Sequence, residues 1–170
     1  MKQNILLPLA GLVLLLSACA PKPSATPYPA ADLFTLLNAQ TAYDSSLAQN
    51  LHADPYGMQR YVMAFLKKGP KRDQDSVTVA RLQKAHLDNI GRLAESGKLV
   101  LAGPFLDNGE VRGIYIFNVA TVEEARELTA TDPAIQAGRL EMELHPWYGS
   151  ASLPLINPLH KRLSKQKIGG

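Results

Sequence analysis

His86 occupies an unusual position in a predicted amphipathic helix. Residues 79–95 read "VARLQKAHLDNIGRLAE", and at about 100° per residue their apolar side chains gather on one face. His86 lies in the middle of that face, one turn from Leu82 and one turn from Ile90. Because an imidazole ionises near neutral pH, a histidine in a partly dry cleft can act as a general acid or base. The alternative is a core histidine whose ring nitrogens are hydrogen-bonded by the backbone.

A second group of polar residues follows near the end of the chain. Glu141, Glu143 and His145 alternate along a predicted strand, so their side chains share one face. Two carboxylates and an imidazole could hold a divalent metal. We favour the alternative, a polar strand face opposite Met142 and Leu144, because no HExxH pattern or paired-cysteine spacing is present. We therefore expect no metal site.

Other site classes lack their sequence patterns. Cys19 is the only cysteine, and Ser150 in "GSAS" is not part of a G-x-S-x-G turn. The sequence has no glycine-rich phosphate loop and no basic-aromatic interleaving of the kind that stacks single-stranded nucleic acid. We expect no cofactor and no nucleic-acid partner.

The first residues predict export and a lipid anchor. Lys2 precedes an apolar run, "ILLPLAGLVLLL", that is shorter than the roughly 20 residues of a membrane span and is typical of a secretory signal. Leu16-Ser17-Ala18-Cys19 resembles the lipobox of bacterial lipoproteins, in which the signal, here 1–18, is removed and the cysteine is acylated. The resemblance implies a membrane partner through lipidated Cys19. Ala20 stands where an inner-membrane retention signal would be Asp, so we expect the outer membrane if the organism has one.

Three segments flank the predicted folded domain. Residues 19–31 are proline-rich and favour an extended tether. Residues 32–59 form an N-terminal extension that we expect to contain short helices against the domain. Residues 151–170 include "HKRLSKQK", a basic tail that we expect to stay solvated, with contact to anionic lipid as the alternative.

The folded domain, residues 60–150, is predicted to have the element order βαββαβ. A capping Asp75 or Ser76 precedes the first helix, Gly97 follows it, and Thr121 with Glu124 has the spacing of a capping box before the second. The Asn108-Gly109 pair is typical of a tight hairpin turn. The predicted strands are 60–68, 98–105, 111–120 and 139–147, and the predicted helices are 76–96, 121–132 and a short turn in "PAIQAG".

This order indicates an α+β, ferredoxin-like fold with helices on one face of an antiparallel sheet. The third predicted strand is apolar on both faces. A sheet with one uncovered apolar face needs a partner, so we expect a homodimer of the dimeric α/β-barrel type.

The sequence resembles YCII-related proteins over residues 60–150. The resemblance rests on "YVMAFLKKGP", "AHLDNIGRLAESGKLVLAGPF" and "TDPAIQAGRLEMELHPWYGS". It implies a ferredoxin-like fold and a His-Asp pair, here His86 and Asp132, proposed in the family as an acid-base dyad. It also implies a pocket shaped by Gly103 and Pro104, with Phe105 beside them. One branch of the family eliminates chloride from a chlorinated hydroxyquinol.

Asp132 also has an ordinary structural explanation. Asp followed by Pro133 is a common N-cap and first helical residue, which is the interpretation that the sequence alone favours. Because a carboxylate has two oxygens, Asp132 could cap the helix and still face His86.

Two hypotheses of function remain at this point, beside a purely structural surface lipoprotein whose cleft is filled by side chains. The first is an envelope lipoprotein whose His86–Asp132 pair acts as a lyase or isomerase on a small cyclic or carbonyl compound. The second is a non-catalytic module that binds a small ligand or a protein. The lipid anchor departs from the typical soluble family member, which weakens any inference of a cytosolic role.

Overall fold

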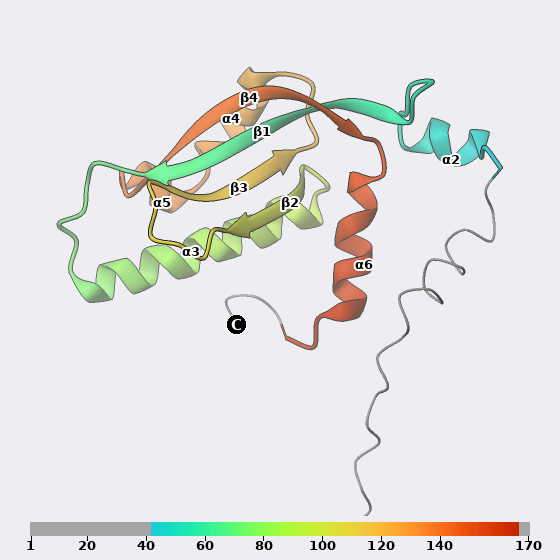
Figure 1. Ribbon diagram of the computed structural model, residues 1–170. Coiled ribbons are helices and arrows are strands. Elements are labelled where there is room, and N and C mark those ends of the chain that lie inside the picture. The colour runs from blue at the N-terminus through green and yellow to red at the C-terminus, as the bar shows by residue number, and fades with distance from the viewer. Residues whose placement is uncertain (1–41, 167–170) are drawn as a thin grey trace, which may run out of the picture. The chain divides into compact units, whose positions relative to one another are not determined.

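Four antiparallel strands form one sheet in the order β2-β3-β1-β4 (Figure 1). The computed structural model describes residues 42–166, and those from Tyr43 onward belong to one unit. The long central strand β1, Met58–Lys68, pairs along its whole length with β4, Leu140–Ser150. The shorter strands β2, Leu99–Pro104, and β3, Val111–Phe117, complete the sheet. The predicted α+β, βαββαβ order is confirmed.

Helix α3, Ser76–Glu95, follows β1, and helices α4, Val122–Thr129, and α5, Pro133–Gln136, precede β4. Each begins with a side-chain cap. Asp75 accepts a hydrogen bond from the Thr78 amide, and Thr121 accepts one from the Glu124 amide. Gly97 and Gly138 follow α3 and α5 with φ of 71° and 67°, a conformation that glycine adopts without steric cost.

Helices α3 and α4 cover one face of the sheet and form the main core there. Leu93 of α3 and Ala125 of α4 pack on Val62, Ala64 and Phe117, and all five side chains are buried. Because strand side chains alternate, every second residue of β1 points away from this core. On the opposite face Tyr61, Val100 and Ile116 form a second, smaller cluster.

The residues after the sheet form helical elements that we did not predict, while the described side chains of the basic segment are exposed, as we expected. A 3₁₀ turn η1, Leu153–Leu155, leads into helix α6, Ile156–Leu163. Leu153 packs on the second cluster, and the Asn157 amide donates to the Leu99 carbonyl at 2.7 Å. The segment therefore lies along the β2 edge of the sheet, although its basic side chains remain exposed.

The N-terminal extension contains the helix α2, Ser45–Asn50, as expected, while residues 32–41 lie outside the described part. The predicted tight turn at Asn108-Gly109 is wrong. Strands β2 and β3 are joined by residues 105–110, and Gly109 does not adopt the positive φ of such a turn. Instead the Asp107 carboxylate accepts the Gly109 amide, which closes a local turn of a different kind. Within residues 42–166, no helix has the length and apolar character needed to span a bilayer.

Candidate functional site

The His86 ring and the Asp132 carboxylate form a buried hydrogen-bonded pair. His86 Nδ1 lies 2.6 Å from Asp132 Oδ2, although the two residues are 46 positions apart. His86 is 7% exposed and Asp132 is fully buried. Since a buried carboxylate needs a donor, the geometry assigns the proton to Nδ1 and leaves Nε2 with a lone pair that can accept a proton or a hydrogen bond. This is the tautomer in which an imidazole can act as a base through Nε2.

The same carboxylate also caps α5. Asp132 Oδ1 accepts the Ala134 amide at 2.8 Å, while Oδ2 faces His86. Pro133 then occupies the first turn of the helix. Asp132 is therefore both the N-cap of α5 and the partner of His86, with one carboxylate oxygen for each role. The cap also fixes the orientation of the carboxylate, and the carboxylate in turn orients the imidazole.

Tyr115 of β3 stands beside the other ring nitrogen. Its hydroxyl lies 3.4 Å from His86 Nε2, and the two rings stack at a centroid separation of 6.3 Å. Burial raises the pKa of Tyr115 above its ordinary value, and the negative charge of Asp132 raises this pKa further. The phenol therefore stays protonated at neutral pH and can donate to Nε2 or to a ligand beside it.

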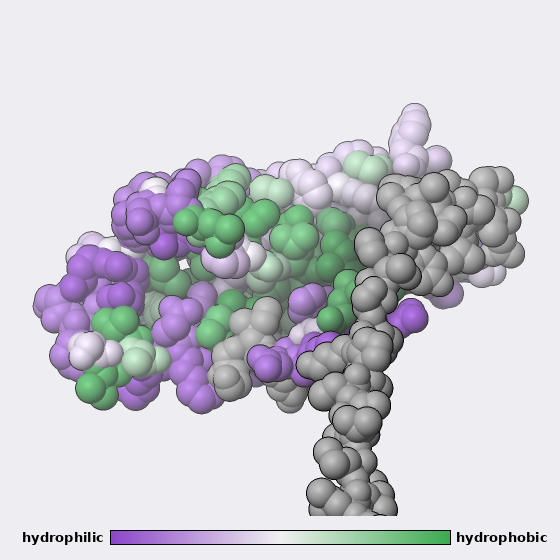
Figure 2. Space-filling model, turned by 60° about the horizontal axis from the view of Figure 1, so that its bottom comes forward, coloured by the Kyte–Doolittle hydropathy of each residue, from purple (hydrophilic) through white to green (hydrophobic). Residues whose placement is uncertain are grey.

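These three side chains lie at a cleft of about 1230 Å³, which His86 and Tyr115 line. Its lining comes from helix α3, from strands β2 and β3, and from helix α6, which forms one wall. With the side of α3 and α6 turned forward, apolar side chains gather in a hollow bordered by hydrophilic ones (Figure 2). The apolar lining includes Leu66, Leu87, Ile90, Leu99 and Leu140.

Gly103 and Pro104 line the cleft at the end of β2. Here the chains of β2 and β3 approach closely, because a Cβ on Gly113 would lie 2.5 Å from the Gly103 carbonyl oxygen. Phe105 is not among the lining residues and is 43% exposed. The structure thus brings Gly103 and Pro104, but not Phe105, to the cleft that His86 lines.

A family model described as the YCII-related domain matches residues 61–148, which include most of the sheet, the helices α3 to α5 and the buried His-Asp pair. The chain belongs to this family. No curated protein matches the chain significantly. The match ends before α6, so one wall of the cleft lies outside the YCII-related domain.

The remaining sequence candidates lie elsewhere. Cys19 is outside the described residues. Glu143 bonds Lys67 at 3.1 Å and His145 at 2.9 Å, on the sheet face away from the cleft. The Lys67 hydrogen bond, followed by that of His145, holds the pKa of Glu143 below its ordinary value. Among residues 42–166, no three potential ligands converge as they would on a metal.

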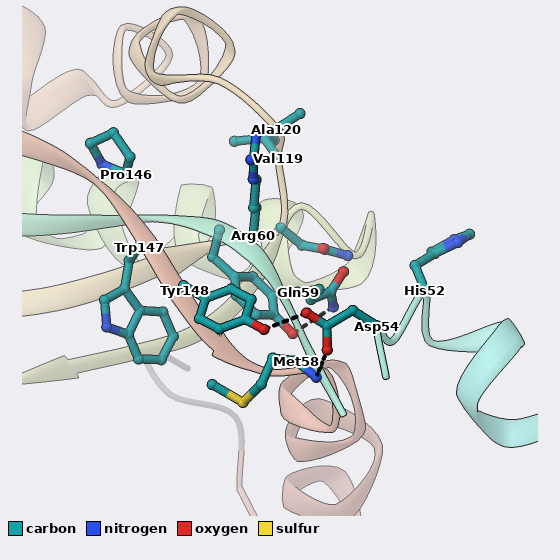
Figure 3. A pocket seen from close by; sticks show the side chains of 12 residues that line it. His52, Asp54, Met58, Gln59, Arg60, Val119, Ala120, Pro146, Trp147 and Tyr148 are labelled. Carbon is teal, nitrogen blue, oxygen red and sulfur yellow. Dashed lines mark hydrogen bonds between the residues drawn. The ribbon is translucent and has the colours of Figure 1, made fainter. Parts of the chain in front are cut away.

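A second cavity, of about 880 Å³, lies where the N-terminal extension meets the start of β1 and the end of β4 (Figure 3). Its one lining carboxylate, Asp54, accepts the amides of Tyr56 and Met58 and the hydroxyl of Tyr148. These bonds hold the turn before β1 in place. The cavity lacks a buried acid-base pair, so the His86 cleft is the better candidate for chemistry.

Tyr115 and the wall formed by α6 were not predicted from the sequence. Tyr115 lies in a strand that is apolar throughout, and the register that places it opposite Ala64, and so on the helix-covered face, comes from pairing with β1. The alternation of strand faces was the available signal, but it required the partner strand.

Proposed function

We propose that this YCII-related domain binds a small cyclic or carbonyl compound in the His86 cleft and moves a proton on it, as a lyase or isomerase. The observation that carries this proposal is the buried hydrogen bond between His86 Nδ1 and Asp132 Oδ2 beside a cleft that His86 lines. His86 Nε2 is the base. Asp132 orients the ring and stabilises the imidazolium that forms.

The proton then returns from Nε2 either to a second carbon, which is an isomerisation, or to a departing group, which is an elimination. The neutral Tyr115 hydroxyl, 3.4 Å from Nε2, can donate a hydrogen bond to an oxygen of the ligand on which negative charge develops. The apolar lining keeps water away from the ligand and strengthens these interactions.

The proposal places this domain at a membrane surface of the bacterial envelope. The support is the lipobox-like sequence ending at Cys19 and the proline-rich tether that follows it. Two or more acyl chains on Cys19 would give stable anchoring, and Ala20 favours the outer membrane in an organism that has one.

A homodimer is the second part of the proposal. Away from α3 and α4, half-buried apolar side chains extend over all four strands, at Met63, Phe65, Leu101, Ile114 and Trp147. A second copy packed against this face would remove them from water.

The test is proton exchange, which needs no knowledge of the product. The full chain is incubated in D₂O with a panel of small ketones and cyclic enols, and loss of ligand C–H signals is followed by NMR. We expect exchange with the native chain and none with His86→Asn. His145→Asn, which changes an exposed histidine on the other sheet face, should behave as the native chain does.

The alternative function is a non-catalytic binding module for a small ligand or a protein. It is favoured by the low exposure of His86 and by the complete burial of Asp132, which also suit a structural pair. Ligand binding in the cleft with no exchange in any compound would support this alternative. Unfolding of His86→Asn would likewise indicate a structural histidine.

A further inference from the structure

Positive charge is concentrated around the cleft. Two carboxylates line it, Asp88 and Glu95, and Asp88 is already paired with Lys84 on the exposed side of α3. Six cationic side chains also line the cleft: Arg72, Arg92, Arg112, Arg139, Lys161 and Lys165. Within residues 42–166, none of the six lies within salt-bridge distance of a carboxylate. The cleft therefore carries an excess of positive charge that no ion pair among the described residues neutralises.

Two of these cations are held together where β1 ends and β4 begins. Arg72 Nη1 donates to the Arg139 carbonyl at 3.0 Å, and Arg139 Nη1 donates to Gln74 Oε1 at 3.2 Å. Arg139 is half-buried. Each guanidinium has five N–H donors, so one such bond leaves most of them free.

This pair is adjacent to the candidate catalytic residues in the fold. Arg139 directly follows the turn after α5, whose N-cap is Asp132, and Ala134 of α5 lines the same cleft. The backbone also fixes the position, because the Gly69 amide donates to the Arg139 carbonyl at 2.9 Å. Guanidinium groups in fixed positions suit the planar, two-oxygen geometry of a carboxylate.

The interior of the cleft has the opposite character. The same lining includes the apolar side chains of Leu66, Ile90, Leu99 and Leu140, together with the ring of Tyr115. A ligand that fits both parts has an apolar, ring-sized body and an acidic group at one end. Helix α6 and the residues after it strengthen this selection, because α6 adds Lys161 and the following segment adds Lys165, both outside the family-matched region.

We propose that the cleft takes a small acid, with its apolar body over Tyr115 and its carboxylate or phosphate on Arg72 and Arg139. This inference rests on the proposed function only in taking the cleft as the ligand site. It narrows the small cyclic or carbonyl compounds to those that carry an anionic group. A neutral ligand of the same shape leaves the two guanidinium groups without an acceptor and binds more weakly.

The experiment compares three probes of one shape: benzoate, phenyl phosphate and benzamide. Each is titrated into the full chain labelled with ¹⁵N, and the amide signals of Gly103, Gly113 and Ala134, which lie around the cleft, are followed. We expect an acid to shift these signals and to bind about 10-fold more tightly than benzamide, as charge-assisted hydrogen bonds imply. The acid that binds more tightly identifies the anionic group.

Two variants assign the effect to the guanidinium pair. Arg72→Gln and Arg139→Gln should each weaken binding of the acid about 10-fold and leave benzamide unchanged. Arg81→Gln is the matched control, because Arg81 is exposed on α3 and does not line the cleft. Benzamide binding as tightly as both acids, or equal losses in all three variants, would overturn the inference. Binding of an acid without proton exchange on any compound would instead contradict the proposed catalysis and leave this inference standing.

Discussion

The Asp132 carboxylate divides its two oxygens between a helix and an imidazole. Oδ1 caps α5 through the Ala134 amide, and Oδ2 lies 2.6 Å from His86 Nδ1. The cap holds the carboxylate in one orientation, so the His86 ring is held as well. At the scale of single residues, the fold thus uses an ordinary helix start to orient a candidate base.

Asp132→Asn separates the two tasks of this residue. The amide oxygen can still accept the Ala134 N–H, so the cap is kept, while the amide nitrogen can donate to His86 Nδ1 in place of accepting from it. We expect the ring proton to move to Nε2, which removes the base from the cleft and lowers proton exchange by about two orders of magnitude or more. The ¹⁵N shifts of the neutral ring report the tautomer directly. The same protonated nitrogen in both proteins would contradict this account.

His86 was easier to predict from the sequence as a site residue than Asp132 was. His86 stands out because 3.6-residue periodicity places it among apolar side chains, and in the structure Leu82, His86 and Leu93 are buried on that face of α3. Asp132 has only the signature of an N-cap, and the resemblance to the family was needed to link it to His86. Tyr115 lacked any local signal, because its place beside His86 depends on long-range strand register.

At the scale of elements, β2 and β3 approach each other closely where they line the cleft. A Cβ at Gly113 would meet the Gly103 backbone oxygen at 2.5 Å, so Gly113→Ala must push the two strands apart. In contrast, a Cβ at Gly91 in α3 would meet nothing within 4 Å. The two glycines line the same cleft but differ in the space around them.

We therefore expect opposite effects from the two alanine substitutions. Gly113→Ala should destabilise the fold by about 1 to 3 kcal/mol through overpacking. Gly91→Ala should stabilise it by roughly 0.5 to 1 kcal/mol, because glycine in a helix interior is unfavourable. Urea unfolding midpoints measure both changes. A neutral Gly113→Ala would mean that the strands can separate at that point without cost.

The order of elements was predictable, but some ends and turns were not. Apolar periodicity and capping residues located α3 and α4 within a few residues. The prediction of a tight turn at Asn108-Gly109 was wrong because the Gly109 amide donates to the Asp107 carboxylate, which forms a different local turn. Helix α6 was missed because a basic segment with prolines at 154 and 158 resembles a tail, and its position is set by contacts such as that of Asn157 with Leu99.

At the scale of the whole molecule, the sheet face without α3 and α4 has two parts. Its apolar part is half-buried in one copy, and its polar part consists of Lys67, Glu143 and His145, in which Glu143 bonds the other two. The pKa of Glu143 is lowered by these partners, first by Lys67. The stabilisation is therefore present above the ordinary carboxyl pKa and is lost as pH falls through the lowered value. At neutral pH the Glu143 carboxylate is already paired with Lys67, which favours packing against a second copy.

A charged substitution on the sheet face without α3 and α4 tests the proposed dimer. Phe65→Glu places a carboxylate at a half-buried position in the middle strand, where two copies would bring like charges into an apolar contact. We expect the native chain to have the mass of a dimer in light scattering, and Phe65→Glu that of a folded monomer.

Val77→Glu is the matched control for this test, because Val77 is an exposed apolar residue at the start of α3, 78% accessible and on the other side of the sheet. It should remain dimeric. A native chain that is monomeric at tens of micromolar would contradict the dimer. If Val77→Glu is monomeric and Phe65→Glu stays dimeric, the interface lies on the helical side of the sheet. The dimer would then involve α3, which also lines the cleft.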